Sequence, residues 1–335
     1  MKTSLLFSLL LLAQSNAVIG QSNALPAAPS SAPPGKLAPR PLYRDPPFDA
    51  PTDPVLNFNA EQNKWFMYYT QRRATATNTP GVTWVHGTRI GMAESSDGGA
   101  TWTYRGEAQI QYGKDAHPND YTHWAPEVIW FEDTYHMYLT FVPGIFTDWN
   151  HPREIVHLTS KDGVKWDTVG PLDLKSDRVI DPCVIQLSNG VWRLWYKDER
   201  KARSLCYADS PDLFQWEAKG NAVTNFSGEG PKVIHWKGRY WLIADCWANG
   251  MRVWRSDDCL NWTLQDEPLF GSHGDVVISG DRAWWFYFGG NRSAARTRAT
   301  AINVVELSVT EGKLLPGDRD QPTYIDLKSL REEER

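Results

Sequence analysis

The chain has 335 residues, with 35 Lys and Arg against 40 Asp and Glu, and its formal net charge is −5. This balance, without any long run of basic residues, argues against a nucleic-acid-binding surface. The 17 tryptophans and the 13% of aromatic residues supply large packing surfaces, and exposed aromatic rings also suit the apolar faces of sugars. The length allows one large domain or two small ones.

The first residues have the pattern of a secretory signal peptide: a basic residue, an apolar stretch at 5–12 and small residues near position 17. The apolar stretch is too short to span a bilayer, and no cysteine follows it as a lipid anchor. The next stretch is rich in Ala, Pro and Ser, as disordered linkers are. We expect a signal peptide at 1–20, a linker at 21–40 and one domain at 41–335, secreted or periplasmic, without a membrane anchor.

The rest of the chain repeats one pattern five times. Each repeat has an aromatic strand with alternating residues, at 64–70, 134–142, 191–199, 239–247 and 282–290. A shorter apolar strand precedes each of them. Short strands separated by turns are typical of antiparallel hairpins. Five such repeats without an amphipathic helix predict an all-β fold, a five-bladed β-propeller, with the stretch at 301–309 as a closing strand.

Four repeats also contain an acidic turn that ends in Trp. The first turn reads Ser95-x-Asp97-x-Gly99-x-Thr101-Trp102, the Asp-box pattern of many propellers. Its Asp closes the turn by accepting backbone N–H bonds, and its Trp packs between neighbouring sheets. We interpret these turns as features of the architecture rather than of the chemistry.

Three acidic residues open the first strand of a repeat: Asp53 in DPVLNF, Asp181 in DPCVIQ and Glu229 in EGPKVI. Burying a carboxylate is costly unless the fold uses it, although an Asp before Pro can also cap a turn. The first strands of a propeller line its central channel, so these residues are expected to meet in one funnel. Cleavage of a glycosidic bond needs two carboxyl groups, and a third can raise the pKa of the acid.

Several segments together resemble glycoside hydrolase family 43 and its clan relatives over residues 45–310: TDPVLNFN, HWAPEVIWFEDTYHMYLTF, VIDPCVIQ, GEGPKVIHWKGRYWLI and SHGDVV. The resemblance implies an inverting glycosidase of the arabinofuranosidase or xylosidase type, acting on plant or algal polysaccharide fragments without a required cofactor. It implies Asp53 as general base, Asp181 as modulator of the pKa of the acid, and Glu229 as general acid.

The resemblance also assigns His273 to a channel position that lies beside a metal, often calcium, in many members. A structural calcium ion at His273 is therefore one expectation, and a histidine bonded only to protein or water is the other. A lone His with distant carboxylates lacks the spacing of a dedicated zinc site.

The chain departs from the family at two places. Glu127 follows Ala-Pro where members usually have Asp, and 71–91 is a long insertion. These departures leave room for the related family 117, whose members cleave terminal anhydrogalactose from agar or carrageenan fragments, although its N-terminal helical motif is absent. A non-catalytic sugar-binding propeller would not need the carboxylates. A phosphorylase would need a basic cluster, for which Arg72, Arg73 and His86 are candidates.

Six residues near the expected funnel are candidates for contact with an oligosaccharide or polysaccharide substrate, with packing or salt bridging as the alternative for each. They are Trp124, His123, Trp84, His86, Arg178 and Arg292. The four cysteines lack CxxC spacing, which argues against a zinc site. Export permits a disulfide between Cys246 and Cys259, and buried free thiols are equally compatible with the sequence.

Overall fold

The computed structural model of the protein describes residues 35–114, 120–201, 205–290 and 298–328. The predicted signal peptide and most of the predicted linker at 21–40 lie outside the described residues. The end of that linker already forms strand β1 (Lys36–Leu37), which pairs with β23 (Tyr324–Ile325) near the other end of the chain. The paired part of the chain therefore begins before residue 41.

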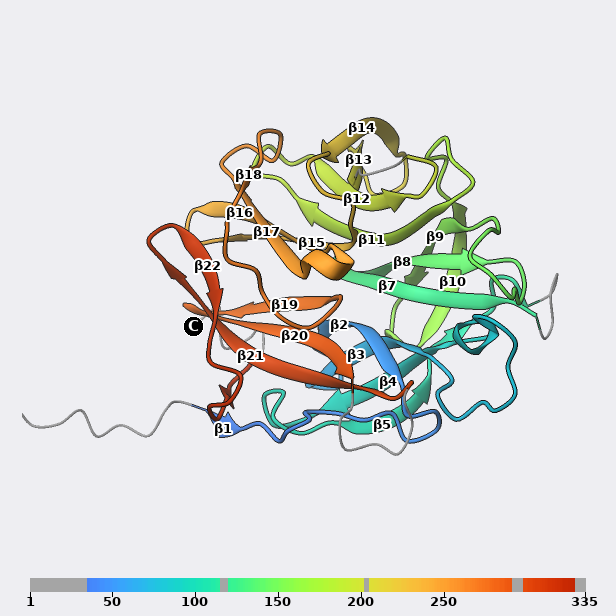
Figure 1. Cartoon of the computed structure of the whole chain (residues 1–335), viewed down its shortest axis with the longest axis horizontal. Coiled ribbons are helices and arrows are strands. Elements are labelled where there is room, and N and C mark those ends of the chain that lie inside the picture. Colours follow the sequence, from blue (N-terminus) through green and yellow to red (C-terminus); the bar gives the residue numbers. More distant parts are fainter. Residues whose placement is uncertain (1–34, 115–119, 202–204, 291–297, 329–335) are drawn as a thin grey trace, which may run out of the picture. The chain divides into compact units, whose positions relative to one another are not determined.

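Five sheets follow one another around a ring (Figure 1). Each contains four antiparallel strands in sequence order, and the second has a fifth strand that pairs in parallel. The first blade contains β2 (Pro51–Asn59), β3 (Lys64–Gln71), β4 (Ile90–Ser95) and β5 (Thr103–Glu107). The second contains β7 (Thr122–Phe131), β8 (Thr134–Val142), β9 (Glu154–Ser160) and β10 (Lys165–Pro171), and β6 (Gln109–Ile110) pairs with β10. The third contains β11 (Val179–Gln186), β12 (Trp192–Asp198), β13 (Leu205–Ser210) and β14 (Glu217–Val223).

The fourth blade contains β15 (Glu229–Trp236), β16 (Arg239–Asp245), β17 (Met251–Ser256) and β18 (Thr263–Leu264), and the fifth contains β19 (Gly274–Ser279), β20 (Arg282–Gly290), β21 (Thr300–Thr310) and β22 (Lys313–Pro316). Two short 3-10 turns, η1 (Thr83–Val85) and η2 (Trp247–Asn249), lie in loops after the second strand of a blade. The predicted five-bladed β-propeller is confirmed. In the described part of the chain, no helix has the length and apolar character needed to cross a membrane.

The first strands of the blades share a bulge that shapes the channel. Each first strand contacts the first strand of the next blade, and β19 contacts β2, so that these five strands enclose the channel. In four of them the residue before a proline has a positive φ, namely Asp53 (52°), Ala125 (40°), Asp181 (57°) and Gly230 (58°). At each, the first strand has one extra residue relative to the second. Such a bulge bends the strand and redirects a side chain. Asp53 and Asp181 thus occupy equivalent positions, whereas Glu229 precedes its bulge by one residue.

The acidic turns have the structure that the sequence predicts. Asp97 accepts bonds from the backbone N–H and the hydroxyl of Thr101, both at 2.9 Å. In the other three turns, the Asp accepts bonds from the backbone N–H groups two and three residues later, at Asp162, Asp212 and Asp258. The Trp of a turn packs against the preceding blade, as Trp166 does against Tyr68, with ring centroids 6.0 Å apart. These turns hold the blades together.

The ring closes by packing between the fifth and the first blade. Phe286 of β20 and Tyr69 of β3 lie in one buried cluster with residues from both ends of the described chain. Tyr43 and Ile302 exchange two backbone hydrogen bonds, at 2.9 and 3.1 Å. The stretch expected as a closing strand is the third strand of the fifth blade, β21, and it contributes to closure through this bridge.

All four cysteines are buried free thiols. Cys246 and Cys259 therefore do not form the disulfide that export would permit. Burial raises the pKa of Cys246 to about 11 and that of Cys259 to about 12. Both thiols stay protonated and unreactive at neutral pH.

Candidate active site

A pocket of about 430 Å³ lies at the end of the channel where the first strands begin. Asp53, Asp181 and His273 line this pocket and also a smaller cavity deeper in the channel, so they form the pocket floor. The other lining residues come from the first four blades: Arg72, Val85, Trp124, Trp149, Arg153, Ile180, Glu199, Glu229 and Trp247. The three predicted carboxylates are therefore brought together, with His273 among them.

The imidazole of His273 lies between the carboxylates. Its Nδ1 is 3.3 Å from Asp53 Oδ1 and 3.8 Å from Asp181 Oδ2. Its Nε2 is 3.3 Å from Glu229 Oε1 and 3.8 Å from Asp245 Oδ2. One ring thus contacts acidic groups from the first, third and fourth blades. The protonation state of each of these carboxylates therefore depends on that of His273.

The local sequence around Glu229 explains how the ring fits. Gly230 adopts the left-handed conformation of the bulge, and a Cβ on it would lie 2.4 Å from Cγ of His273. The absent side chain therefore makes room for the imidazole. The N–H of Gly230 also donates to Asp181 Oδ2 at 2.9 Å. The glycine of the EGP segment consequently positions both the histidine and a carboxylate.

The charges in the floor are coupled through His273. Burial alone would lower the pKa of His273, but its contacts with Asp53 and Glu229 raise it well above the usual value. Burial would raise the pKa of Asp53, yet Arg72 and His273 hold it well below its usual range. Burial likewise opposes ionisation of Glu229, and His273 again lowers the pKa. At neutral pH the floor therefore contains an imidazolium between two carboxylates.

Asp181 differs from the other two carboxylates. Burial, together with the charges of Glu229 and Asp53, raises its pKa to about 7 despite the opposing effect of His273. The sequence led us to expect that Asp181 would keep Glu229 protonated. In the structure the raised pKa belongs to Asp181 itself, because the imidazolium stabilises the ionised form of Glu229.

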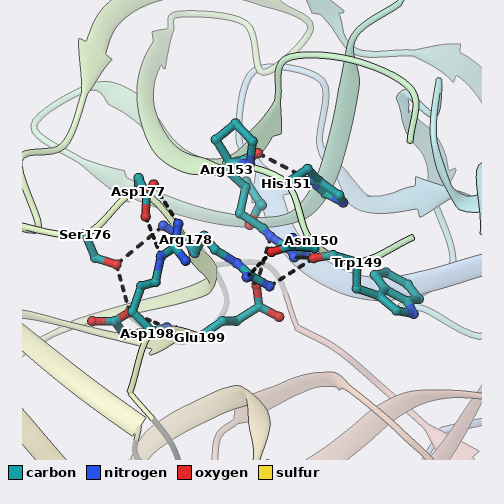
Figure 2. Close-up of polar contacts among 12 residues, drawn as sticks. Trp149, Asn150, His151, Arg153, Ser176, Asp177, Arg178, Asp198 and Glu199 are labelled. Atoms are coloured by element: carbon teal, nitrogen blue, oxygen red, sulfur yellow. Dashed lines mark hydrogen bonds and ion pairs between the residues drawn. The ribbon is translucent and has the colours of Figure 1, made fainter. Parts of the chain in front are cut away.

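One wall of the pocket is held by an arginine cluster, shown in Figure 2. The buried Arg153 places its Nε 2.8 Å from Glu199 Oε2. Arg178 donates to the side chain of Asn150 at 3.0 Å and to the carbonyl of Trp149 at 2.9 Å. These bonds fix the loop that carries the Trp149 ring, which is half exposed (49%) and lines the pocket. Of the two contacts predicted for Arg178, the one with a carboxylate is present, because its Nε lies 3.8 Å from Glu199 Oε2. Arg178 does not line the pocket, and its contact with a substrate stays a prediction.

The structure separates the two neighbours predicted at the mouth of the second blade. Trp124 lines the pocket, and its Nε1 donates to the carbonyl of Val85 at 2.7 Å. His123 is 1% exposed, and its Nε2 lies 3.1 Å from the carbonyl oxygen of Tyr112. The predicted sugar contact of His123 is wrong, because adjacent strand residues face opposite sides.

The two residues of the first-blade insertion that were predicted to contact a substrate, Trp84 and His86, do not line the pocket. His86 is fully buried behind Trp124, with ring centroids 5.0 Å apart, and is out of reach of a substrate. Trp84 stacks with the guanidinium of Arg298, whose Cζ is 5.1 Å from the ring centroid, and does not line the pocket. Val85, which lies between Trp84 and His86 in the sequence, does line the pocket. Arg292 lies outside the described residues.

The basic cluster that a phosphorylase would need is not assembled in the described pocket. Of its three candidates, Arg72 lines the pocket. Arg73 donates to the carbonyl of Thr83 at 2.7 Å, and His86 is buried. Arg153 and His273 also line the pocket, but Arg153 pairs with Glu199 at 2.8 Å and His273 pairs with Asp53 and Glu229 at 3.3 Å each. The described pocket therefore has no cluster of unpaired basic groups.

Sequence reasoning missed several wall residues that share one topological position. Trp149, Glu199 and Trp247 all lie in the loop between the second and third strand of a blade, as Arg72 does in the first blade. These loops open at the same end of the channel as the starts of the first strands. A search for aromatic and charged residues after each aromatic strand would have found them.

The described side chains do not form a cage for calcium at His273. Calcium takes six to eight oxygen ligands. Within the described ranges, no group of three or more His, Cys, Asp or Glu side chains is arranged to hold a metal ion. Both ring nitrogens of His273 face carboxylates at 3.3 Å, which favours a protonated ring rather than a metal ligand.

Among known proteins, no family model and no curated protein matches the chain. Several solved structures are similar to it. A thermostable family-43 glycoside hydrolase has a TM-score of 0.66 over 86% of this chain and 100% of its own, at 16% identity. A family-43 β-xylosidase/α-arabinofuranosidase from a compost microbial metagenome, in complex with xylotriose in a calcium-free form, has a TM-score of 0.64 over 84% and 97%, at 16% identity.

An exo-1,5-α-L-arabinanase from a bovine ruminal metagenomic library has a TM-score of 0.60, covering 81% of this chain and 99% of its own, at 18% identity. At such identities the likeness concerns the fold. The carboxylates, the histidine and the tryptophans described above lie at the channel mouth of that fold. The chain therefore shares the five-bladed propeller fold of these glycoside hydrolase structures.

Proposed function

We propose that the protein is an inverting glycoside hydrolase of the arabinofuranosidase or xylosidase type. The observation that carries this proposal is the floor of the pocket, where Asp53 and Glu229 each lie 3.3 Å from one nitrogen of His273. Trp124, Trp149 and Trp247 line the pocket and offer the ring faces that bind sugars.

The two carboxylates suit different steps of one displacement. Asp53 stays ionised because its pKa is low, so it can accept a proton from the attacking water. Glu229 would protonate the leaving oxygen. The two 3.3 Å contacts, joined through the imidazole ring, limit the separation of these oxygens to at most about 9 Å, which is compatible with the ~6.5–9.5 Å of inverting enzymes.

Glu229 must acquire a proton before it can act as an acid. We assign this proton to His273, whose Nε2 lies 3.3 Å from Glu229 Oε1. When a sugar displaces water from the pocket, the buried ion pair loses solvation. Transfer of the proton then gives a neutral imidazole and a carboxylic acid. Asp181, bonded to the N–H of Gly230, would hold the backbone next to the acid in place.

The similar structures and the sequence support one class of substrate. Family-43 structures of this fold include enzymes solved with xylotriose or xylose. We therefore propose pentose-containing fragments of plant or algal polysaccharides as substrates. The signal-peptide pattern at the start of the chain supports export from the cytoplasm. The anhydrogalactosidase and the non-catalytic sugar-binding propeller are alternative outcomes of the test below.

The test is a screen of aryl glycosides of arabinofuranose, xylose and galactose, together with agar and carrageenan oligosaccharides. We expect hydrolysis of a pentoside, with the product released in the inverted anomeric configuration by NMR. Glu229→Gln and Asp53→Asn should each lower kcat by about 10²–10⁴-fold while the circular dichroism spectrum is unchanged. Glu217→Gln, at an exposed site, is the control. A retained anomeric configuration, or full activity in either variant, would refute the assignment.

A further inference from the structure

A second cluster of charges lies in the channel below the pocket floor. Lys232 Nζ is 2.7 Å from Asp275 Oδ1, and it is 3.0 and 3.1 Å from the two carboxylate oxygens of Glu127. All three residues are buried, with at most 8% of their surface exposed. A buried ammonium group is stable only where such partners compensate for lost solvation.

This cluster reaches the first strand of every blade. Glu127, Lys232 and Asp275 belong to the second, fourth and fifth blades. Asp275 Oδ2 accepts the N–H of Leu56 in the first blade at 2.8 Å. Glu127 Oε1 accepts the N–H of Val184 in the third blade at 3.3 Å. One lysine and two carboxylates thus connect five strands.

The cluster also lies in register with the floor above it. The small cavity below the floor is lined by Asp53, Asp181 and His273 of the floor and also by Glu127 and Lys232, and Asp275 follows His273 by two residues. Residues two apart on a strand face the same side, about 7 Å apart. The charged cluster is therefore the next layer of side chains along the channel, and it holds the strands that carry the floor.

The charge balance requires cations at this place. Carboxylates from all five blades converge in the two layers, and like charges oppose one another's ionisation. His273 compensates the upper layer. In the lower layer, burial disfavours the charged lysine, but Asp275 and Glu127 raise the pKa of Lys232 well above its usual value. The ammonium group therefore stays charged at neutral pH.

The space between the layers leaves little room for a hydrated metal. The cavity there is about 30 Å³, which is enough for about two water molecules. Calcium would need most of its six to eight oxygens from the protein. The oxygens of Glu127 and Asp275 are already bonded to Lys232 and to backbone N–H groups.

We propose that Lys232 is the built-in cation of this channel and that it holds the first strands in register without a divalent metal ion. The ammonium group occupies the position between two carboxylates that a metal ion would otherwise need. This inference concerns the folded channel and does not rest on the proposed hydrolysis.

The first test measures the Tm of the full chain after EDTA treatment and after addition of millimolar CaCl₂. We expect the same Tm in both conditions and no heat of calcium binding by calorimetry. A Tm that rises with calcium and falls with EDTA would overturn the proposal. Because no substrate is involved, this result is independent of whether the screen for glycosidase activity succeeds.

The second test compares Lys232→Met with Lys237→Met. Lys237 pairs with Asp281 at 2.8 Å on the surface, so its variant loses an ion pair without burying a charge. We expect a large drop in Tm for Lys232→Met, partly recovered by calcium because Glu127 and Asp275 become available, and almost no drop for the control. Equal Tm values for both variants would overturn the proposal. Should Lys232→Met fail to fold, Glu127→Gln supplies the comparison: it keeps the pair of Lys232 with Asp275 and should lower Tm without any calcium response.

Discussion

The contact between Gly230 and His273 can be tested with a single methyl group. A Cβ at position 230 would lie 2.4 Å from Cγ and 2.6 Å from Nδ1 of the imidazole, far inside van der Waals contact. Ala125 occupies the equivalent bulge with a φ of 40°, so the backbone conformation by itself accepts a Cβ. What excludes alanine at 230 is the histidine ring.

The expected loss of stability in Gly230→Ala combines the cost of the left-handed backbone conformation with the cost of the clash with His273. An L-residue in the left-handed region costs about 1–2 kcal/mol, and overpacking a rigid site costs about 1–3 kcal/mol. We therefore expect Gly230→Ala to lower the free energy of unfolding by about 2–5 kcal/mol. A shift of the ring by roughly 1 Å would disturb its contacts with Asp53 and Glu229, and kcat/KM should fall by about 10²-fold.

Gly238→Ala provides the matched control. Gly238 has a φ of 77°, and no heavy atom lies within 4 Å of the place that a Cβ would take there, so this variant has the backbone cost without the clash. Urea unfolding gives the stability of both variants, and hydrolysis of the aryl glycoside that the wild type accepts gives their activity. If Gly230→Ala matches Gly238→Ala in both measurements, the ring does not depend on the glycine and the reasoning fails.

Two further predictions concern the pocket wall and a buried histidine pair. Trp149→Ala should raise KM roughly tenfold, corresponding to about 1.4 kcal/mol, with little change in kcat or stability. The control is Trp130→Ala, at a residue that lines the channel away from the pocket. Equal KM values for the two variants would contradict the assignment of Trp149 to the pocket wall. His136 and His157 share a 2.9 Å hydrogen bond, and burial lowers their pKa values to about 4 and about 3. Their stabilising effect is therefore complete above the unfolded pKa of about 6.5 and is lost as pH falls toward 4, so urea unfolding should show about 4 kcal/mol less stability at pH 5 than at pH 7 for the two groups together. A His157→Phe variant with an unchanged pH dependence would contradict this.

The fold and the pocket floor could be predicted because both depend on repetition. Five aromatic strands at regular spacing define the blades, and the blades place Asp53, Asp181 and His273 around one channel. The error at His123 was also avoidable. Trp124 faces the pocket. Because adjacent residues of a strand face opposite sides, the side chain of His123 then points away from the pocket.

The walls could not be predicted in the same way, because loop conformations depend on contacts between blades. In the first-blade insertion, only Arg72 and Val85 of the described residues line the pocket. The N–H of Val82 bonds to the carbonyl of Thr147 at 3.0 Å, which packs the insertion against the loop of Trp149. No local pattern in either segment indicates that pairing.

The protonation of the floor depends on geometry that no sequence motif contains. From the sequence, we considered Asp181 and Glu229 as two carboxylates that interact only with each other. In such a pair, repulsion between the charges would leave one carboxyl group protonated. Because His273 lies nearer to Glu229 than to Asp181, the imidazolium favours ionisation of Glu229, and Asp181 keeps the raised pKa. The three groups titrate together, so a pH–rate profile would report apparent pKa values of the cluster rather than of one residue. If the protein hydrolyses glycosides as proposed, binding of a sugar redistributes one proton within the cluster before the leaving oxygen is protonated.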